Sequence, residues 1–310
     1  MVPLEGALRQ NGCILDATQL PPMSQHVAMS LTLEQRTNLH GIPKAAELIE
    51  ITGAHALEAS DRAILNLLYQ HAHDSGRLGD PTACWELPIT ALRPSKHNGT
   101  DRIRDSLSRL ISVQVKVAYR EAKTGRDRIL LTHLFESFDI PADEGLGGPV
   151  RYRVPISLVP ILAESSRWGR IKAEIVCAMT SKYAIALYEL VQLRGNLDRC
   201  TEHFTVARFR DLLGVPPNAY ERGNDLIKRV IDPACVEVNG LSELGVKIEV
   251  ERAYSRAPIT GVQLGWWRKD GEEYRQTYRE RQRSKLGRMA RLRGQMQADT
   301  PAPIRLGSIP

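Results

Sequence analysis

The chain has 310 residues, of which 42% are hydrophobic and 25% charged, and its formal net charge is +6. This length can hold two modest domains with real hydrophobic cores. The longest apolar runs are too short to cross a membrane, which excludes a membrane-spanning protein. The start, Met1–Glu5, lacks the charged and apolar regions of a signal peptide, so we expect a cytoplasmic protein.

Five cysteines are scattered singly along the chain: Cys13, Cys84, Cys177, Cys200 and Cys235. No two of them form a C-x-x-C pair, and an odd number does not complete a disulfide framework. We therefore expect reduced, mostly buried thiols and no metal site. The chain also lacks the G-x-x-x-x-G-K-[ST] motif of a P-loop ATPase, and no catalytic set of residues stands out. We expect neither an enzyme nor a bound cofactor.

The positive charge is concentrated near the C-terminus. Residues 268–293 hold ten Lys/Arg and four Asp/Glu, and so carry the whole net charge of +6. The rest of the chain is balanced, so a nucleic-acid surface there must be a local patch.

A first set of elements follows an N-terminal stretch rich in prolines and polar residues. In chain order we predict a helix Leu57–Ala72 with Ser60 as a possible N-cap, a short strand Trp85–Leu87, a short helix Ile89–Leu92, a helix Asp101–Ile111, a hairpin of Val113–Tyr119 and Ile129–Phe135, a strand Arg151–Val154 and a helix Ile156–Leu162. Apolar residues recur at helical spacing in the long helices and alternate in the strands.

A second set of elements lies between residues 181 and 268. It comprises a helix from Ser181 with Tyr183, Leu187, Leu190 and Val191 on one face, an extended piece His203–Thr205, a helix Val206–Gly214, a third helix beginning near Tyr220, and a hairpin of Val246–Val250 and Val262–Trp266. Thr205 is the expected N-cap of the second helix, and Gly214 with Pro216 ends it. Three short helices followed by a hairpin is the order of a winged helix, a helix-turn-helix with a β wing.

Because the same order of elements appears twice, we predict an α+β fold of tandem winged-helix domains. The first domain would cover residues 54–166 and the second residues 172–268. Residues 1–53 would form a partly disordered N-terminal arm, and residues 269–310 a basic C-terminal tail. The segment 165–170 would connect the two domains.

Three stretches of the chain resemble the iteron-binding plasmid replication initiators, the Rep family with two winged-helix domains: Ser181–Glu189 (SKYAIALYE), Phe204–Val215 (FTVARFRDLLGV) and Asp225–Asn239 (DLIKRVIDPACVEVN). The resemblance covers roughly residues 54–268, and the first half matches by pattern only. Pro233 would kink the third helix on general grounds. Its place in the RVIDPA stretch suggests that the kink belongs to the family pattern.

The resemblance implies a non-enzymatic role in replication. Monomers would bind tandem direct repeats in double-stranded DNA at an origin and help open an adjacent AT-rich segment. The family further implies recruitment of host helicase and initiator proteins, and a dimer that represses the protein's own promoter. In the family the second domain reads the repeat in the major groove. The first domain adds contacts to the DNA backbone, or serves instead as a dimer interface.

The third helix of the second domain carries side chains suited to reading DNA: Arg222, Asn224, Lys228 and Arg229. Arginine can pair with guanine and asparagine with adenine, while lysine pairs with phosphate. Further candidate DNA contacts surround this helix or follow the wing: Lys182, Arg252, Arg256, Arg268 and Lys269. In the first domain we expect outward-facing candidates on the helix Asp101–Ile111: Arg102, Arg104, Ser106 and Arg109.

Three alternatives stay open at this point. A winged-helix transcriptional repressor would bind an inverted repeat as a dimer without opening DNA. A nicking enzyme would use His71-Ala72-His73 as a metal motif, but residues two apart on a helix point about 200° apart, which disfavours a shared metal. The basic tail would either contact the DNA backbone or form a solvated or partner-binding helix.

Overall fold

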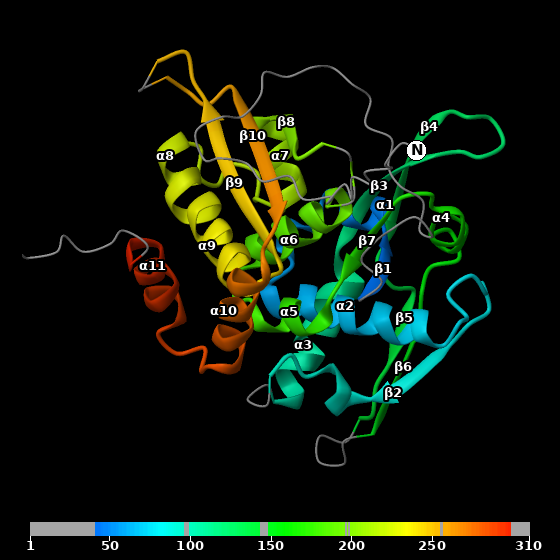
Figure 1. The fold of residues 1–310 in the computed structure, drawn as a ribbon. Helices are drawn as coiled ribbons and strands as arrows, with labels where there is room; N and C mark the ends of the chain where they lie inside the picture. The colour runs from blue at the N-terminus through cyan, green and yellow to red at the C-terminus, as the bar shows by residue number, and fades with distance from the viewer. Residues whose placement is uncertain are drawn as a thin grey trace, which may run out of the picture.

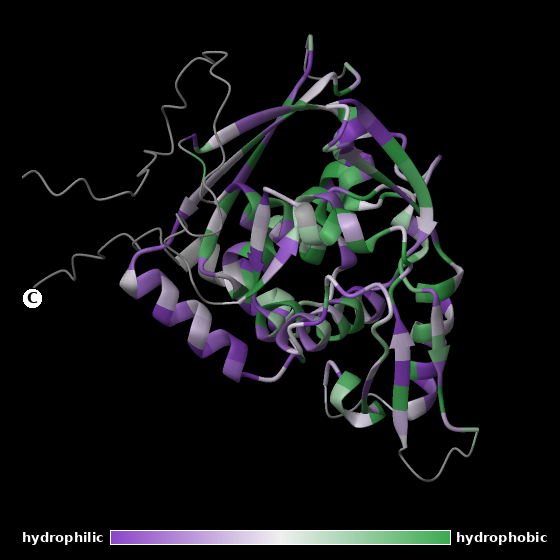
Figure 2. Ribbon diagram, turned by 90° about the vertical axis from the view of Figure 1, so that its right-hand side faces the viewer, coloured by the Kyte–Doolittle hydropathy of each residue, from purple (hydrophilic) through white to green (hydrophobic). Residues whose placement is uncertain are grey.

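The computed structural model describes residues 41–95, 99–142, 148–195, 197, 199–254 and 257–298 (Figure 1). Hydrophobic residues gather towards the middle of the molecule, and hydrophilic residues predominate at its periphery (Figure 2). The buried side chains form two cores, one around helix α2 (Ala59–Asp74) and the other around helix α6 (Lys182–Arg194). The two sets of elements predicted from the sequence therefore each have a core.

The first domain repeats the predicted order of elements. They are α2, β2 (Trp85–Pro88), the 3-10 helix η2 (Ile89–Leu92), α3 (Thr100–Ser112), β3 (Gln114–Arg120), β4 (Asp127–His133), β5 (Ser137–Asp139), β6 (Pro149–Arg153) and α4 (Val159–Glu164). The hairpin β3–β4 is separate from an antiparallel sheet of order β2-β6-β5. The N-cap of α2 is Glu58 rather than Ser60, because Glu58 and Asp61 form a reciprocal capping box.

The second domain has the complete winged-helix arrangement. Its elements are α6, β8 (Thr201–Thr205), α7 (Val206–Leu213), α8 (Gly223–Leu226), the helical turn η3 (Ile227–Ile231), α9 (Asp232–Leu241), β9 (Leu244–Glu251) and β10 (Gly261–Arg268). The strands form one antiparallel sheet of order β8-β10-β9, with Val262 opposite both Phe204 and Val250. Figure 1 shows the wing hairpin β9–β10 extending beyond the helices.

The third helix runs from Gly223 to Leu241 without a break, although it contains a proline. Pro233 lacks a backbone N–H, and its ring clashes with the carbonyl four residues earlier in a regular α-helix. The chain forms a π-helical turn at Ile227–Ile231, immediately before α9, which has Pro233 in its first turn. A π turn widens the helix locally, so the proline is accommodated without ending the helix.

The end of the predicted N-terminal arm is part of the fold. Residues 1–40 of this arm lie outside the described residues. From there the chain forms β1 (Ile42–Ala45), α1 (Ala46–Ile49) and the 3-10 helix η1 (Ala54–Ala56). Strand β1 pairs with β7 (Trp168–Ile171), in the predicted connection between domains, and α5 (Ala173–Ala178) follows. These elements are three to six residues long, too short to show a hydrophobic period in the sequence.

The predicted basic tail is folded up to residue 298. It forms α10 (Gly271–Gln282) and α11 (Arg288–Ala298), which pack beside α9 (Figure 1). Leu292 of α11 is buried against Gly240 of α9. Several tail cations are used internally, because Arg291 pairs with buried Glu280 at 2.6 Å and Arg288 Nη1 donates to the Ala178 carbonyl at 2.8 Å.

A buried ion pair joins strand β1 to helix α6. Lys44 Nζ of β1 lies 2.8 Å from Glu189 Oε1 of α6, and both side chains are almost fully buried. Asn66 Nδ2 of α2 donates to the same carboxylate oxygen at 2.7 Å. Burial lowers the pKa of Lys44, while the facing carboxylate acts in the opposite direction. The three side chains fix α2 and β1 against α6.

Two absences apply to the described part of the chain. No helix there is long and apolar enough to cross a membrane. Nor do three or more His, Cys, Asp or Glu side chains gather there in a way that could hold a metal ion.

Four of the five cysteines lie in the described part of the chain, and none of these four is in a disulfide. Burial raises the pKa of Cys177 to about 11 and that of Cys235 to about 12.

Candidate nucleic-acid interface

A helix-turn-helix unit is formed by α7 and the helix that begins at Gly223. Thr205 caps α7, since its hydroxyl accepts a hydrogen bond from the Arg208 backbone N–H at 3.3 Å. Gly214 ends α7 in the left-handed region, with φ of 70°. The turn is held by Arg210, whose guanidinium donates to backbone carbonyls of the turn: those of Pro216, Ala219 and Tyr220. The turn therefore sets the position of the third helix relative to α7.

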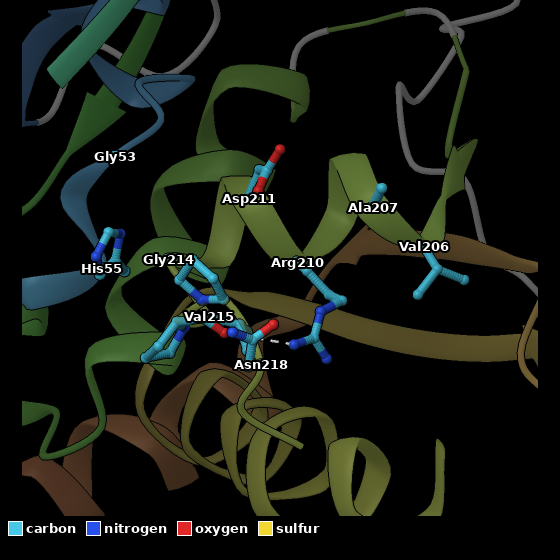
Figure 3. A pocket seen from close by; sticks show the side chains of 11 residues that line it. Gly53, His55, Val206, Ala207, Arg210, Asp211, Gly214, Val215 and Asn218 are labelled. Atoms are coloured by element: carbon cyan, nitrogen blue, oxygen red, sulfur yellow. Dashed lines mark hydrogen bonds between the residues drawn. The ribbon is translucent and has the colours of Figure 1, made fainter. Parts of the chain in front are cut away.

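A cavity of about 480 Å³ lies between this turn and the first domain. Its walls come from Gly53 and His55 on one side and from α7 and residues 214–218 on the other (Figure 3). Figure 3 shows Arg210 extending from α7 towards Asn218. The cavity therefore lies where η1 of the first domain contacts the helix-turn-helix.

The predicted reading residues on the third helix face solvent. Arg222, Asn224, Lys228 and Arg229 are all exposed, while Leu226, Val230 and Ile231 are buried on the opposite side. The nearest acid to Arg229 is Asp225, one helical turn away at 3.9 Å, so its guanidinium is only weakly paired. This end of the helix presents three cations and an amide in one strip.

The wing lies against this strip. Arg252 Nη2, at the end of β9, donates to the Asn224 side-chain oxygen at 3.2 Å. A Cβ on Gly223 would lie 2.9 Å from Ile259 of the wing, so the helix start and the wing are in close contact. Arg268 is exposed at the end of β10. Arg256 lies outside the described residues. We call Arg222, Asn224, Lys228, Arg229 and Arg252 the reading surface.

Two predicted DNA contacts of the second domain are structural instead. Lys182 Nζ donates to the His55 carbonyl at 2.9 Å and so joins α6 to the first domain. Lys269 Nζ donates to the carbonyls of Asn239 and Ser242, the latter at 2.9 Å, at the C-terminal end of α9. Burial lowers the pKa of Lys269 to about 8. In this structure each ammonium group is used to satisfy backbone carbonyls.

In the first domain, only one of the four predicted contacts points freely outwards. Arg102 is exposed on α3. Ser106 is fully buried, with its hydroxyl near Ser60, and Arg109 forms a two-pronged ion pair with buried Asp61 at 2.8 and 2.9 Å. Arg104 Nη2 donates to the Pro141 carbonyl at 2.6 Å. The prediction that Ser106 faces outwards is wrong. Arg104 and Arg109 form bonds within the first domain, because α3 packs against α2, β4 and β5.

The two histidines of the possible metal motif diverge. His71 is half-buried with Nδ1 3.0 Å from the Tyr152 hydroxyl, whereas His73 is beside Asp74. This is the divergence expected from helix geometry.

Three arginines beside strand β8 were not among the predicted contacts. Arg167, Arg199 and Arg208 line a pocket with Glu50 and Glu202. They come from separate segments of both domains, so no local sequence pattern indicates that they meet.

Two family models match the chain in the order of these domains. Residues 42–192 match the WH1 domain of an initiator replication protein, and residues 205–266 match the WH2 domain of the initiator Rep protein. The chain belongs to the initiator Rep family. The tandem winged-helix fold predicted from the sequence is thereby confirmed. The WH1 match extends into α6, beyond the domain boundary predicted at residue 166.

One solved initiator structure has a similar fold, and a second is similar over a smaller part of the chain. A crystal structure of the Pi initiator protein in complex with iteron DNA is 14% identical, covers 74% of this chain and 97% of its own, and has a TM-score of 0.50. The WH1 domain of a replication protein isolated from a multiple sclerosis patient is 11% identical over 34% of this chain and 79% of its own, with a TM-score of 0.25. No curated protein matches the sequence.

Proposed function

We propose that this Rep-family protein binds double-stranded DNA sequence-specifically and initiates replication of a plasmid. The observation that carries the proposal is the reading surface, where exposed Arg222, Lys228 and Arg229 lie on the second helix of a helix-turn-helix, next to the wing. In such a unit this helix enters the major groove and its N-terminal residues contact base edges. The Pi initiator, similar in fold, was crystallised with iteron DNA.

The finer steps rest on the resemblance of the sequence to iteron-binding initiators. Monomers bind tandem direct repeats, their binding destabilises an adjacent AT-rich segment, and host helicase and initiator proteins are recruited there. A dimer represses the protein's own promoter. The protein binds DNA without catalysing a covalent step and acts in the bacterial cytoplasm.

The test uses the DNA that flanks this gene and any tandem direct repeats within it. Footprinting checks whether the protein covers them, and permanganate, which modifies unpaired thymines, checks whether adjacent AT-rich DNA opens. Protection with new permanganate reactivity is the expected result. Protection of an inverted repeat without reactivity would favour a transcriptional repressor, and metal-dependent strand cleavage would favour a nicking enzyme.

A further inference from the structure

A pocket of about 590 Å³ lies at the free edge of β8, between the two domains. The first domain contributes Glu50, next to α1, and Arg167. The second domain contributes arginines and one acid: Arg194, Arg199, Glu202 and Arg208. We call it the arginine pocket.

Both carboxylates of the pocket bond one buried guanidinium, and Glu202 also accepts a hydrogen bond from Arg199 Nη2 at 2.9 Å. Arg194, whose side chain is 4% exposed, lies 2.6 Å from Glu50 and 2.7 Å from Glu202. Burial alone would raise the pKa of Glu50, but the charges of Arg194, Arg167 and Arg208 outweigh burial and lower it. This lowered pKa favours the charged form of Glu50. By formal charge, the four arginines and two acids of the pocket leave an excess of two positive charges.

The excess positive charge is accessible to a ligand. The side chains of Arg199 and Arg208 are 41% and 40% exposed, and Arg167 is half-exposed. Arg208 is 3.6 Å from Glu50, longer than a direct hydrogen bond, so its guanidinium has donors left for another acceptor. The first turn of α7, capped by Thr205, borders the pocket and adds the positive end of the helix dipole.

The arginine pocket is linked to the reading surface through the sheet. Thr205 is paired with Gly261, which is also paired with Glu251 at the loop end of the β9–β10 hairpin. His203, in the pocket wall, lies 3.0 Å from Glu251, and the next residue, Arg252, bonds to Asn224. When the second helix of a helix-turn-helix lies in the major groove, the first helix crosses the DNA backbone. Here the first helix is α7, and the arginine pocket lies at its N-terminal end.

We infer that the arginine pocket binds a phosphate of the DNA backbone beside the bases read by the third helix. Arg199 and Arg208 are the direct contacts, with Arg167 adding charge from the first domain. Because the pocket is built from both domains, a phosphate held there ties the first domain to the same DNA segment as the second. The inference rests on the proposed DNA binding and assigns sequence-independent contacts to residues outside the reading surface.

The test compares the full-length wild type with the double variant Arg199→Ala/Arg208→Ala. The probes are a duplex selected from a random-sequence pool by the wild type and a scrambled duplex of the same composition. Each lost phosphate contact makes the slope of log affinity against log salt shallower by about 0.9. We expect a slope shallower by roughly 2, with affinity reduced by a similar factor on both duplexes. Arg199→Lys/Arg208→Lys should keep most of the slope.

The matched control is Arg275→Ala/Arg279→Ala, which removes two exposed arginines from α10. It should leave the slope unchanged, and thermal unfolding should show that both double variants are folded. An unchanged slope in the pocket variant, with specific binding still lost in Arg229→Ala, would overturn the inference and leave the proposed function standing. If the wild type bound neither duplex, the proposed function itself would fail.

A free anion is the other source of the same chemistry. If millimolar inorganic phosphate raised the unfolding temperature of the wild type but not of the pocket variant, while the salt slope of DNA binding stayed the same in both, the pocket would be a site for free phosphate. That result would also overturn the assignment to the DNA backbone.

Discussion

Arginines have different roles in this protein, and the role of each depends on the residues around it. Arg229 is exposed and only weakly paired, so it can contact a base. Arg109 lies on helix α3 of the first domain, but its guanidinium bonds both carboxylate oxygens of buried Asp61. A guanidinium already engaged with a buried carboxylate cannot leave it for DNA without exposing an unpaired buried charge.

The first prediction at this scale concerns base reading. Arg229→Ala or Lys228→Ala should weaken specific DNA binding by about 1–3 kcal/mol if the side chain reaches a base edge. Stability should hardly change, because both positions are outward on the third helix. Binding titrations and thermal unfolding measure the two effects, with Arg279→Ala of α10 as an exposed arginine control. Normal binding by both variants would show that the reading surface is misassigned.

The second prediction concerns the pH dependence contributed by Lys269. Its pKa is about 8 in the folded protein, because burial disfavours the charged form, and about 10.4 in an unfolded chain. Below pH 8 both states are protonated. Between the folded and unfolded pKa values of Lys269, the unfolded state binds more protons than the folded state. The contribution of Lys269 to the free energy of unfolding therefore rises with pH in this range.

Lys269→Met removes this titration, and groups common to both proteins cancel in the comparison. The free energy of unfolding of the wild type, measured by chemical denaturation relative to Lys269→Met, should therefore increase from pH 8 to pH 10. A difference that is constant over this range would mean that Lys269 is not buried in the folded protein.

At the scale of elements, the tail helices are stabilised by the elements that they pack against. The tail helices α10 and α11 have few apolar residues, but Leu292 packs on Gly240 and the buried acid Glu280 pairs with arginines of α11. The tail is therefore attached to the second half of the third helix. Most of its cations donate to backbone carbonyls or to Glu280, so we expect it to support the reading helix rather than to contact phosphates.

The third prediction tests this role of the tail. Leu292→Ala should lower the free energy of unfolding by about 2–5 kcal/mol, as is typical of buried leucines. Replacing exposed Arg275, Arg279 and Arg293 by alanine should change neither stability nor the salt slope of DNA binding. Truncation after Lys269 would not separate an effect on stability from an effect on the salt slope of DNA binding, because it removes the buried leucine together with the charges. A slope shallower by roughly 3 in the triple variant would show that the tail contacts DNA.

For the whole molecule, the buried polar contacts between domains set their relative position. The fourth prediction concerns the pair Lys44–Glu189. Glu189→Leu should destabilise the protein by about 3–5 kcal/mol, because it leaves the Lys44 ammonium buried without its partner. The double variant Lys44→Met/Glu189→Leu should recover most of the loss. Chemical denaturation of the double-mutant cycle measures this coupling, and additive effects would mean that the two groups do not interact in solution.

The fifth prediction concerns assembly. If the first domain forms a dimer interface in the free protein, two-fold symmetry limits the assembly to a pair. Dilution should then yield monomers, and monomers should occupy a single direct repeat. Analytical ultracentrifugation with and without the DNA measures both. A stable dimer on one direct repeat would instead favour the repressor alternative.

Local patterns in the sequence were enough to predict the fold class. Long amphipathic helices and alternating strands carry their burial pattern in local spacing, and the spacing of Leu226, Val230 and Ile231 on the third helix agrees with their burial, while Arg229 is exposed. A kink at Pro233 was expected from the RVIDPA stretch, and the structure has a π turn directly before α9 without a break in the helix.

Only the tertiary structure decided which charged residues remain available. Strands β1 and β7 are four residues each and form by pairing across more than a hundred positions of sequence, which no local pattern encodes. Ser106, Arg109, Lys182 and Lys269 have the polarity of a solvated face, yet partners distant in sequence bury or engage them. The arginine pocket arises in the same way, from residues spread between positions 50 and 208. Charge is a local property of the sequence, whereas its accessibility depends on contacts that form only when the chain folds.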